Sequence, residues 1–171
     1  MNSDLTVIIF YSYLLGSIPF GLIITRLFLK QDVRKIGSGN IGATNVLRTG
    51  KKSLAILTLF LDILKGYICI YFTLVNFPEF IHLAALICLL GHIFPIWLKL
   101  KGGRGVATYL GILLALSFEL ALIFGISWLL ILYITKYSSL SSILSSLNVF
   151  LFSFYSTLIY PDFIYFTFFF I

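Results

Sequence analysis

Charged residues are scarce in this chain of 171 residues, and acidic residues are the scarcest. Asp, Glu, Lys and Arg make up 11% of the sequence and hydrophobic residues 60%, whereas about a quarter of a typical soluble domain is charged. This composition excludes a soluble globular protein and indicates an all-α integral membrane protein. Only 6 acidic residues accompany 12 Lys and Arg, which gives a formal net charge of +6.

Patterns that hold metals or form disulfides are also lacking. Cys69 and Cys88 lie in apolar runs, so we expect small buried side chains rather than a disulfide. Neither C-x-x-C nor H-E-x-x-H occurs, so we expect no metal site and no cofactor. The N-terminal residues 1–4 lack the basic residues of a signal peptide, so no cleaved leader is expected. Without repeat or linker, residues 1–171 are predicted to form a single integral membrane domain.

Seven apolar runs predict a polytopic bundle of about seven transmembrane helices. The runs cover residues 5–29, 54–75, 80–98, 106–116, 120–134, 143–158 and 163–171. A helix needs about 20 residues to cross a bilayer. We therefore expect the fourth run to borrow part of residues 102–105, and the last helix to remain incomplete where the chain stops.

Antiparallel threading of these runs sorts the charges onto two sides. One side receives Arg26, Lys30, Arg34, Lys35, Arg48, Lys51, Lys52, Lys99, Lys101, Arg104 and Lys136. The other side receives Asp4 and the turns at 76–79, 117–119 and 160–162, which contain no Lys or Arg. Because basic residues gather at the cytoplasmic side, we expect the N-terminus outside and the basic side in the cytoplasm.

The first glycine-rich segment, residues 37–48, reads GSGNIGATNVLR. Its match to the dinucleotide pattern G-x-G-x-x-G is rejected, because a membrane run rather than a strand precedes it. Glycines still allow successive backbone N–H groups to converge on an anion, and Arg48 can grip two phosphate oxygens. The other candidate substrate contacts are Gly37, Ser38, Gly39, Asn40, Gly42, Thr44 and Asn45. The alternative is a solvated loop tip whose basic residues serve only topology.

The second glycine-rich segment, residues 99–108, reads KLKGGRGVAT and opens the fourth helix. A helix N-terminus adds its dipole to the attraction for phosphate. The candidate residues are Lys101, Gly102, Gly103, Arg104 and Gly105. The alternative is a basic cluster that touches anionic lipid headgroups, which does not require three glycines within four residues.

A serine-rich turn at residues 136–142 shares the basic side with these two segments. Ser139 and Ser142 are candidate hydrogen-bond partners for a phosphate. The alternative for these serines is a polar loop that caps the next helix.

Three titratable residues fall inside the apolar runs. His92 is the only histidine near the basic side, and it is either a base or a satisfied core residue. Asp62 and Lys65 stand at i,i+3, so they share a helix face and are predicted to pair. The alternative is that they contact the substrate directly, since charges inside membranes often face cavities.

Several enzyme classes are excluded by what is missing. The residue five positions after His92 is Trp97, so the His-x4-Asp dyad of common glycerolipid acyltransferases is absent. No repeated aspartates of the CDP-alcohol transferases occur, and no serine with a neighbouring base can be assembled. The residues on offer bind anions rather than act as strong acids or bases.

Five blocks of the sequence resemble the acyl-phosphate-dependent glycerol-3-phosphate acyltransferases of bacteria. They cover residues 16–21, 37–48, 62–66, 91–95 and 101–108, and the resemblance runs from about residue 16 to 142. It implies a seven-span protein of the bacterial cytoplasmic (inner) membrane with a cytoplasmic active face. The implied reaction moves a fatty acyl group from acyl phosphate to the 1-hydroxyl of glycerol 3-phosphate. Lysophosphatidate and phosphate are its products, in the first step of phospholipid synthesis.

The resemblance also implies roles for residues and partners. Ser38, Arg48 and either Lys101 or Arg104 would hold the phosphate of glycerol 3-phosphate, and Ser139 would join them. The backbone amides of residues 102–105 would steady the departing phosphate. The base would be a substrate phosphate oxygen, because the protein offers only His92. Membrane lipids and an upstream enzyme that forms the acyl phosphate are the expected partners, and nucleic acid is not.

Two departures from this family carry expectations of their own. Arg104 stands where the family usually has Lys, so a guanidinium fork replaces a point charge. From about residue 147 the sequence is atypical, and the family's cytoplasmic tail with a His and an Asn is missing. One alternative is therefore a truncated copy with little activity. Another is a transporter for a phosphorylated metabolite, although its two related halves would show as an internal repeat.

Overall fold

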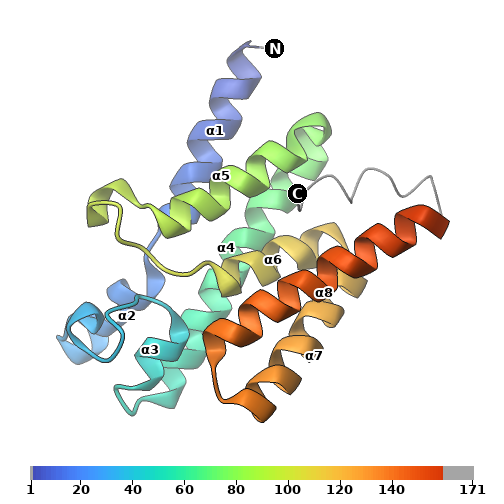
Figure 1. Cartoon of the computed structure of the whole chain (residues 1–171). Coiled ribbons are helices and arrows are strands. Elements are labelled where there is room, and N and C mark those ends of the chain that lie inside the picture. The colour runs from blue at the N-terminus through green and yellow to red at the C-terminus, as the bar shows by residue number, and fades with distance from the viewer. Residues whose placement is uncertain (1, 160–171) are drawn as a thin grey trace. The chain divides into compact units, whose positions relative to one another are not determined.

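The computed structural model describes residues 2–159, and every regular element in that range is helical (Figure 1). The α-helices are α1 (Asn2–Ser17), α2 (Phe20–Leu29), α3 (Ala43–Leu47), α4 (Lys52–Asn76), α5 (Ile81–Ile93), α6 (Val106–Leu116), α7 (Phe118–Thr135) and α8 (Ser138–Ile159). Short 3₁₀ helices are η1 (Val33–Lys35), η2 (Pro78–Phe80) and η3 (Ile96–Leu98). The predicted all-α class is confirmed. The chain forms two compact units, Met1–Ala115 and Leu116–Ile171.

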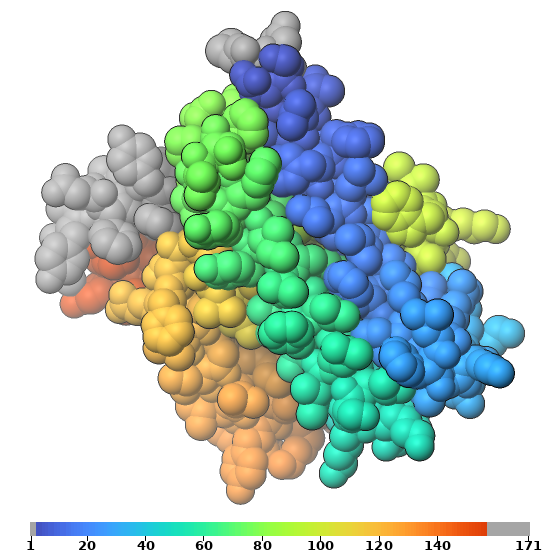
Figure 2. Space-filling model, turned by 180° about the vertical axis from the view of Figure 1, so that it is seen from behind, coloured from blue at the N-terminus to red at the C-terminus, as the bar shows by residue number. Residues whose placement is uncertain are grey.

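Five stretches within the described residues are long and apolar enough to cross a membrane. They are Ser3–Leu29, Lys52–Asn76, Pro78–Leu98, Phe118–Thr135 and Ser138–Ser156. They match five of the predicted runs, and the shorter α6 matches the run at 106–116. On the face in Figure 2, α4 lies beside α1 and α2. This helix keeps large apolar side chains exposed, as a lipid-facing helix does: Ile56, Phe60, Ile68, Tyr71, Phe72 and Val75. The predicted run 163–171 lies outside the described residues.

The first span is not one continuous helix, as the sequence had suggested, but is broken at Ile18 and Pro19. Proline has no N–H to donate and disfavours the helical conformation of the preceding residue. The break frees backbone carbonyls inside an apolar span, where each needs a partner. Trp97 Nε1 donates to Ser17 O at 2.8 Å, and Lys65 Nζ donates to Ile18 O at 2.8 Å.

The fourth run does not borrow residues 102–105, which is a correction to the sequence-based expectation. The helix begins at Val106, because Gly102 N and Gly103 N donate to Ile93 O and His92 O, both at 3.0 Å. Gly105 adopts a φ of +80°, a left-handed conformation that glycine tolerates. The 11 residues of α6 rise about 16 Å, roughly half of the hydrocarbon core.

Helices of the first unit approach closely at glycines. A Cβ at Gly16 would collide with the backbone carbonyl of Cys88, so α1 and α5 touch along their backbones. On α4, a Cβ at Gly66 would collide with Thr108 O of α6. Small residues of this kind allow membrane helices to pack by van der Waals contact. These crossings join α1 to α5, which precedes the second glycine-rich segment, and α4 to α6, which follows it.

The second unit is a helical hairpin in its described part. Ser117 caps α7 by accepting a hydrogen bond from Leu120 N, and Lys136 ends α7 in a left-handed conformation. The seam between α7 and α8 contains small or β-branched residues of α8 that are buried: Ser141, Ser145, Val149 and Ser153.

Candidate active site

Asn45 organises the first glycine-rich segment from within. Its side chain is 2% exposed, and its amide nitrogen donates to the carbonyls of Val33, Ile36 and Asn40 at 2.7–3.0 Å. Its amide oxygen accepts from Ser38 N at 3.1 Å and from Ser38 Oγ at 3.3 Å. The sequence offered Asn45 as a substrate contact. In the structure its polar atoms are engaged in holding the segment's shape.

A small apolar cluster anchors this segment to the membrane helices. Its buried members come from α2, η1, α3, α4 and the segment itself: Leu22, Val33, Ile41, Val46 and Ala55. Gly21 of α2 lets the backbone approach, because a Cβ there would collide with Ile41 O. Asn40 contributes a turn by accepting a hydrogen bond from Gly42 N at 2.9 Å. These apolar contacts therefore fix the position of the first glycine-rich segment relative to α2 and α4.

Arg48 lies over the start of the segment. Gly37 has a φ of +53°, and a Cβ there would come within 2.5 Å of Arg48 Cδ and Nη1. Ser38 follows directly, so the structure brings together two of the predicted phosphate contacts. Both side chains belong to exposed residues, and no described residue forms an ion pair with Arg48. A free guanidinium beside a hydroxyl is suited to a bidentate grip on a phosphate.

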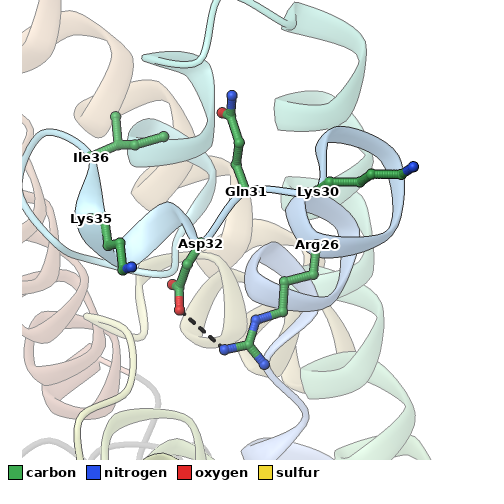
Figure 3. Close-up of a pocket in the computed structure, with 6 residues that line it drawn as sticks. All are labelled: Arg26, Lys30, Gln31, Asp32, Lys35 and Ile36. Carbon is green, nitrogen blue, oxygen red and sulfur yellow. Dashed lines mark hydrogen bonds and ion pairs between the residues drawn. The ribbon is translucent and has the colours of Figure 1, made fainter.

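Asp32 neutralises part of the surrounding positive charge. Its carboxylate accepts from Arg34 Nη2 at 2.6 Å and Arg34 Nε at 2.9 Å, and pairs with Arg26 Nη2 at 3.1 Å. The Arg34 guanidinium, with the backbone N–H of Arg34 and the Arg26 side chain, holds the pKa of Asp32 well below its usual range. Figure 3 shows the Arg26–Asp32 pair beside Lys30 and Lys35, which have no acidic partner among the described residues. These residues line an open cavity of about 640 Å³.

The two glycine-rich segments meet in a second cavity. Its volume is about 380 Å³, and it is lined by Asp32, Arg34, Lys35, Gly39, Lys101 and Gly102. Three of these residues, Gly39, Lys101 and Gly102, were predicted site residues. Arg34 and Lys35 had been assigned only a topological role. Their position two or three residues before Gly37 was the signal that they border the same site.

The second segment offers fewer free amides than its sequence suggested. Gly102 N and Gly103 N donate to carbonyls at the end of α5, so they do not bind a phosphate while those bonds are made. The amides of Arg104 and Gly105 form no hydrogen bond within the described residues, and they stand immediately before α6. The exposed Arg104 side chain lies between these two amides in the sequence.

His92 lies beneath the second segment rather than in either cavity. It is 4% exposed, and its Nδ1 lies 2.8 Å from Lys65 Nζ and 3.2 Å from Thr108 Oγ1. The predicted pairing of Asp62 with Lys65 is confirmed, with 2.8 Å between Oδ1 and Nζ. Of the two alternatives for these charges, the structure shows the paired arrangement, since both side chains are buried.

The two predicted serines belong to the second unit. Ser139 is exposed in the first turn of α8. The Ser142 hydroxyl donates to Ser138 O at 2.8 Å and accepts from Trp128 Nε1 at 3.1 Å. Ser142 therefore links α8 to α7.

These features define a class of protein: a multi-pass helical membrane protein with a cationic cavity lined by two glycine-rich segments. The chain belongs to the glycerol-3-phosphate acyltransferase family, which matches residues 6–171. The glycerol-3-phosphate acyltransferase of Pelagibacter ubique (strain HTCC1062) is 59% identical over 138 residues, which cover 81% of this chain and 72% of that protein. That of Mesorhizobium japonicum is 52% identical over 149 residues, covering 87% and 76%.

Solved structures give the same result. The crystal structure of PlsY (YgiH), an integral membrane glycerol 3-phosphate acyltransferase, superposes in its glycerol 3-phosphate form with a TM-score of 0.83 at 40% identity. Its lysophosphatidic acid form gives 0.80 at 40% identity. Each match covers 88% of this chain and 76% of the solved one. The resemblance seen in the sequence is confirmed, and it favours the acyltransferase over a transporter.

Proposed function

We propose that this chain transfers a fatty acyl group from an acyl phosphate to the 1-hydroxyl of glycerol 3-phosphate. Lysophosphatidate and inorganic phosphate are the products. The observation that carries the proposal is the 380 Å³ cavity in which Lys101 of one segment meets Lys35 and Gly39 beside the other. Both substrates bear phosphate, and the cavity collects the cations Lys35 and Lys101, which can bind phosphate. The substrates named for the relatives support the same chemistry.

The reaction requires no covalent nucleophile, because an acyl phosphate is an activated mixed anhydride. The 1-hydroxyl oxygen attacks the acyl carbonyl carbon and forms the ester bond. The bond from that carbon to the bridging oxygen breaks, and its electron pair leaves with the phosphate. The hydroxyl proton passes to a phosphate oxygen of a substrate. Catalysis then rests on positioning and on electrostatic stabilisation.

We assign the phosphate of glycerol 3-phosphate to Ser38, Arg48 and Lys101, with Arg104 as a further contact. The Arg48 fork beside Ser38 supports this assignment, since it has no competing acidic partner among the described residues. The unengaged amides of Arg104 and Gly105 are suited to steady the departing phosphate. The lipid-facing helices provide apolar surface for the acyl tail.

We place the site at the cytoplasmic face of the bacterial inner membrane, with the N-terminus outside. The support is the sorting of Lys and Arg onto the side of the chain that carries both glycine-rich segments. An enzyme that forms acyl phosphates must act before this one, because this activated donor has to be synthesised before it can give up its acyl group. Cysteine labelling from either side of sealed vesicles, with the exposed Lys51 replaced by Cys, tests the orientation.

The purified full chain in detergent tests the activity. Palmitoyl phosphate is supplied with and without glycerol 3-phosphate, and phosphate and lysophosphatidate are both measured. We expect phosphate release that depends on glycerol 3-phosphate and matches lysophosphatidate mole for mole. A parallel arm replaces palmitoyl phosphate by palmitoyl-CoA. Turnover with the thioester alone would contradict the assigned donor, and turnover with neither donor would contradict the proposed activity.

A further inference from the structure

A fully buried polar network lies directly below the second glycine-rich segment. Lys65 Nζ hydrogen-bonds to Ile18 O and His92 Nδ1, both at 2.8 Å, and forms an ion pair with Asp62 Oδ1 at 2.8 Å. The Phe20 ring covers the ammonium at 5.7 Å from its centroid. Two hydrogen bonds to fixed acceptors and an ion pair hold the ammonium in place.

The network also fixes the imidazole ring of His92. Because Lys65 donates to Nδ1, the ring proton resides on Nε2. Thr108 Oγ1, which is fully buried, lies 3.2 Å from the same Nδ1. The opposite nitrogen, Nε2, lies against Gly103, where an added Cβ would collide with it. The His92 ring therefore packs directly against Gly103.

The backbone of the second segment is fastened to the same place. Gly103 N donates to His92 O, and Gly102 N donates to Ile93 O, both at 3.0 Å. A Cβ at Gly102 would also collide with His92 O. Both glycines thus lie in van der Waals contact with one residue of α5, and they stand between the cations Lys101 and Arg104 in the sequence.

None of the network's side chains lines either described cavity, and Asp62, Lys65 and His92 are each less than 5% exposed. They do not touch a substrate that binds in those cavities. Apolar residues could fill the same volume at a lower desolvation cost. What the polar network adds is a defined orientation of its side chains, because each hydrogen bond fixes an angle as well as a distance.

We propose that Asp62, Lys65 and His92 are positioning residues that fix the backbone of Gly102 and Gly103, and thereby aim Lys101 and Arg104 at the substrate phosphates. The proposal rests on the acyltransferase function for its catalytic consequence, but not for its structural one. Asp62 orients Lys65, and Lys65 orients the His92 ring. The His92 ring and the His92 backbone carbonyl in turn fix Gly102 and Gly103.

Hydrogen–deuterium exchange of the full chain in detergent tests the structural part. We compare Lys65→Met with Lys52→Met, which removes an exposed lysine from the start of the same helix. Exchange at Gly102 N and Gly103 N is expected to rise at least tenfold in Lys65→Met and to be unchanged in Lys52→Met. Unchanged exchange in folded Lys65→Met overturns the proposal. This comparison does not depend on turnover, so it decides the inference even where the acyltransferase assay fails.

Kinetics separate positioning from a loss of folded protein. A smaller folded fraction lowers the apparent kcat and leaves the KM unchanged. Misdirected Lys101 and Arg104 raise the KM for glycerol 3-phosphate, at least about fivefold, and also lower kcat. The triple variant Asp62→Leu, Lys65→Met, His92→Phe leaves no unpaired charge and keeps the volume filled, so it serves where Lys65→Met does not fold. Wild-type KM and wild-type exchange in that variant overturn the proposal.

Discussion

The guanidinium of Arg48 lies directly against the backbone of Gly37, so that a single added carbon at position 37 would approach Arg48 Nη1 to 2.5 Å. Eleven positions separate the two residues in the sequence. Their contact closes the first glycine-rich segment on itself and leaves the guanidinium beside Ser38. The shape of the segment and the placement of its cation are therefore one structural property.

Gly37→Ala is expected to reduce activity through backbone strain and through displacement of Arg48. The matched variant Gly50→Ala separates these two effects. Alanine at a φ of +53° costs about 1–2 kcal/mol, and its methyl group also displaces Arg48. Gly50 has a φ of +81° but no atom within 4 Å of a built Cβ, so Gly50→Ala carries only the conformational cost. Because the Gly37→Ala methyl group also comes within 2.6 Å of Asn45 Oδ1, this variant should lower the unfolding temperature more than Gly50→Ala does. Only Gly37→Ala should raise the KM for glycerol 3-phosphate, and equal KM values would contradict the Arg48 assignment.

Arg48→Ala is expected to abolish measurable turnover while the protein still inserts and folds. A charge-assisted hydrogen bond contributes about 1.5–3 kcal/mol, so losing two of them lowers kcat/KM by at least about a hundredfold. Arg48→Lys keeps the positive charge without the guanidinium fork, so its kcat/KM should lie between those of the wild type and Arg48→Ala. Lys51→Ala, an exposed cation three residues away, is the control. Normal turnover in Arg48→Ala would remove this residue from the site.

Asn45→Ala is expected to destabilise the first segment rather than to weaken substrate contacts alone. It leaves three backbone carbonyls and the Ser38 amide without their partner, at a cost of about 2–4 kcal/mol. The side chain of Asn76 makes one hydrogen bond among the described residues, to Phe72 O, so Asn76→Ala should cost less than about 1 kcal/mol. Denaturant unfolding measures both variants. Equal stability of the two would refute the organising role of Asn45.

Asp32 is expected to make the free energy of unfolding depend on pH in the acidic range. Arg34 lowers the pKa of this carboxyl from an ordinary value of 3.8, so its contribution is fully present above that value and is lost as pH falls through the lower, folded pKa. The stability difference between the wild type and Asp32→Asn should therefore be constant from pH 7 to about 5 and shrink below about pH 4. Unfolding measured across that range checks it. A difference that grows on acidification would reverse the assigned sign.

The sequence predicted the membrane spans well because lipid imposes a simple rule of length and apolarity. It also located both glycine-rich segments and the Asp62–Lys65 pair, since glycine content and i,i+3 spacing are local properties. It did not predict which polar groups are already used inside the protein. The amides of Gly102 and Gly103 donate to carbonyls at the end of α5, and both ends of the Asn45 side chain bond to backbone groups 5 to 12 residues away.

Two further differences have the same origin. Arg34 and Lys35 look like topology signals in the sequence, and only the approach of Lys101 makes them part of a cavity. Pro19 warned of a break in the first span, but the run of apolar residues around it was long enough to hide the break. In each case a partner distant in sequence decides the outcome.

The carbonyls released at that break have a consequence for biosynthesis. Ile18 O is matched by Lys65, 47 residues later, and Ser17 O by Trp97, 80 residues later. A ribosome delivers the first span long before it delivers either partner. Ile18 O also accepts from the nearby Phe20 N at 3.2 Å, whereas Ser17 O lacks its partner until synthesis passes Trp97, so water, the insertion machinery or lipid headgroups must solvate it in the interval. The first span reaches its final form only when the third has arrived.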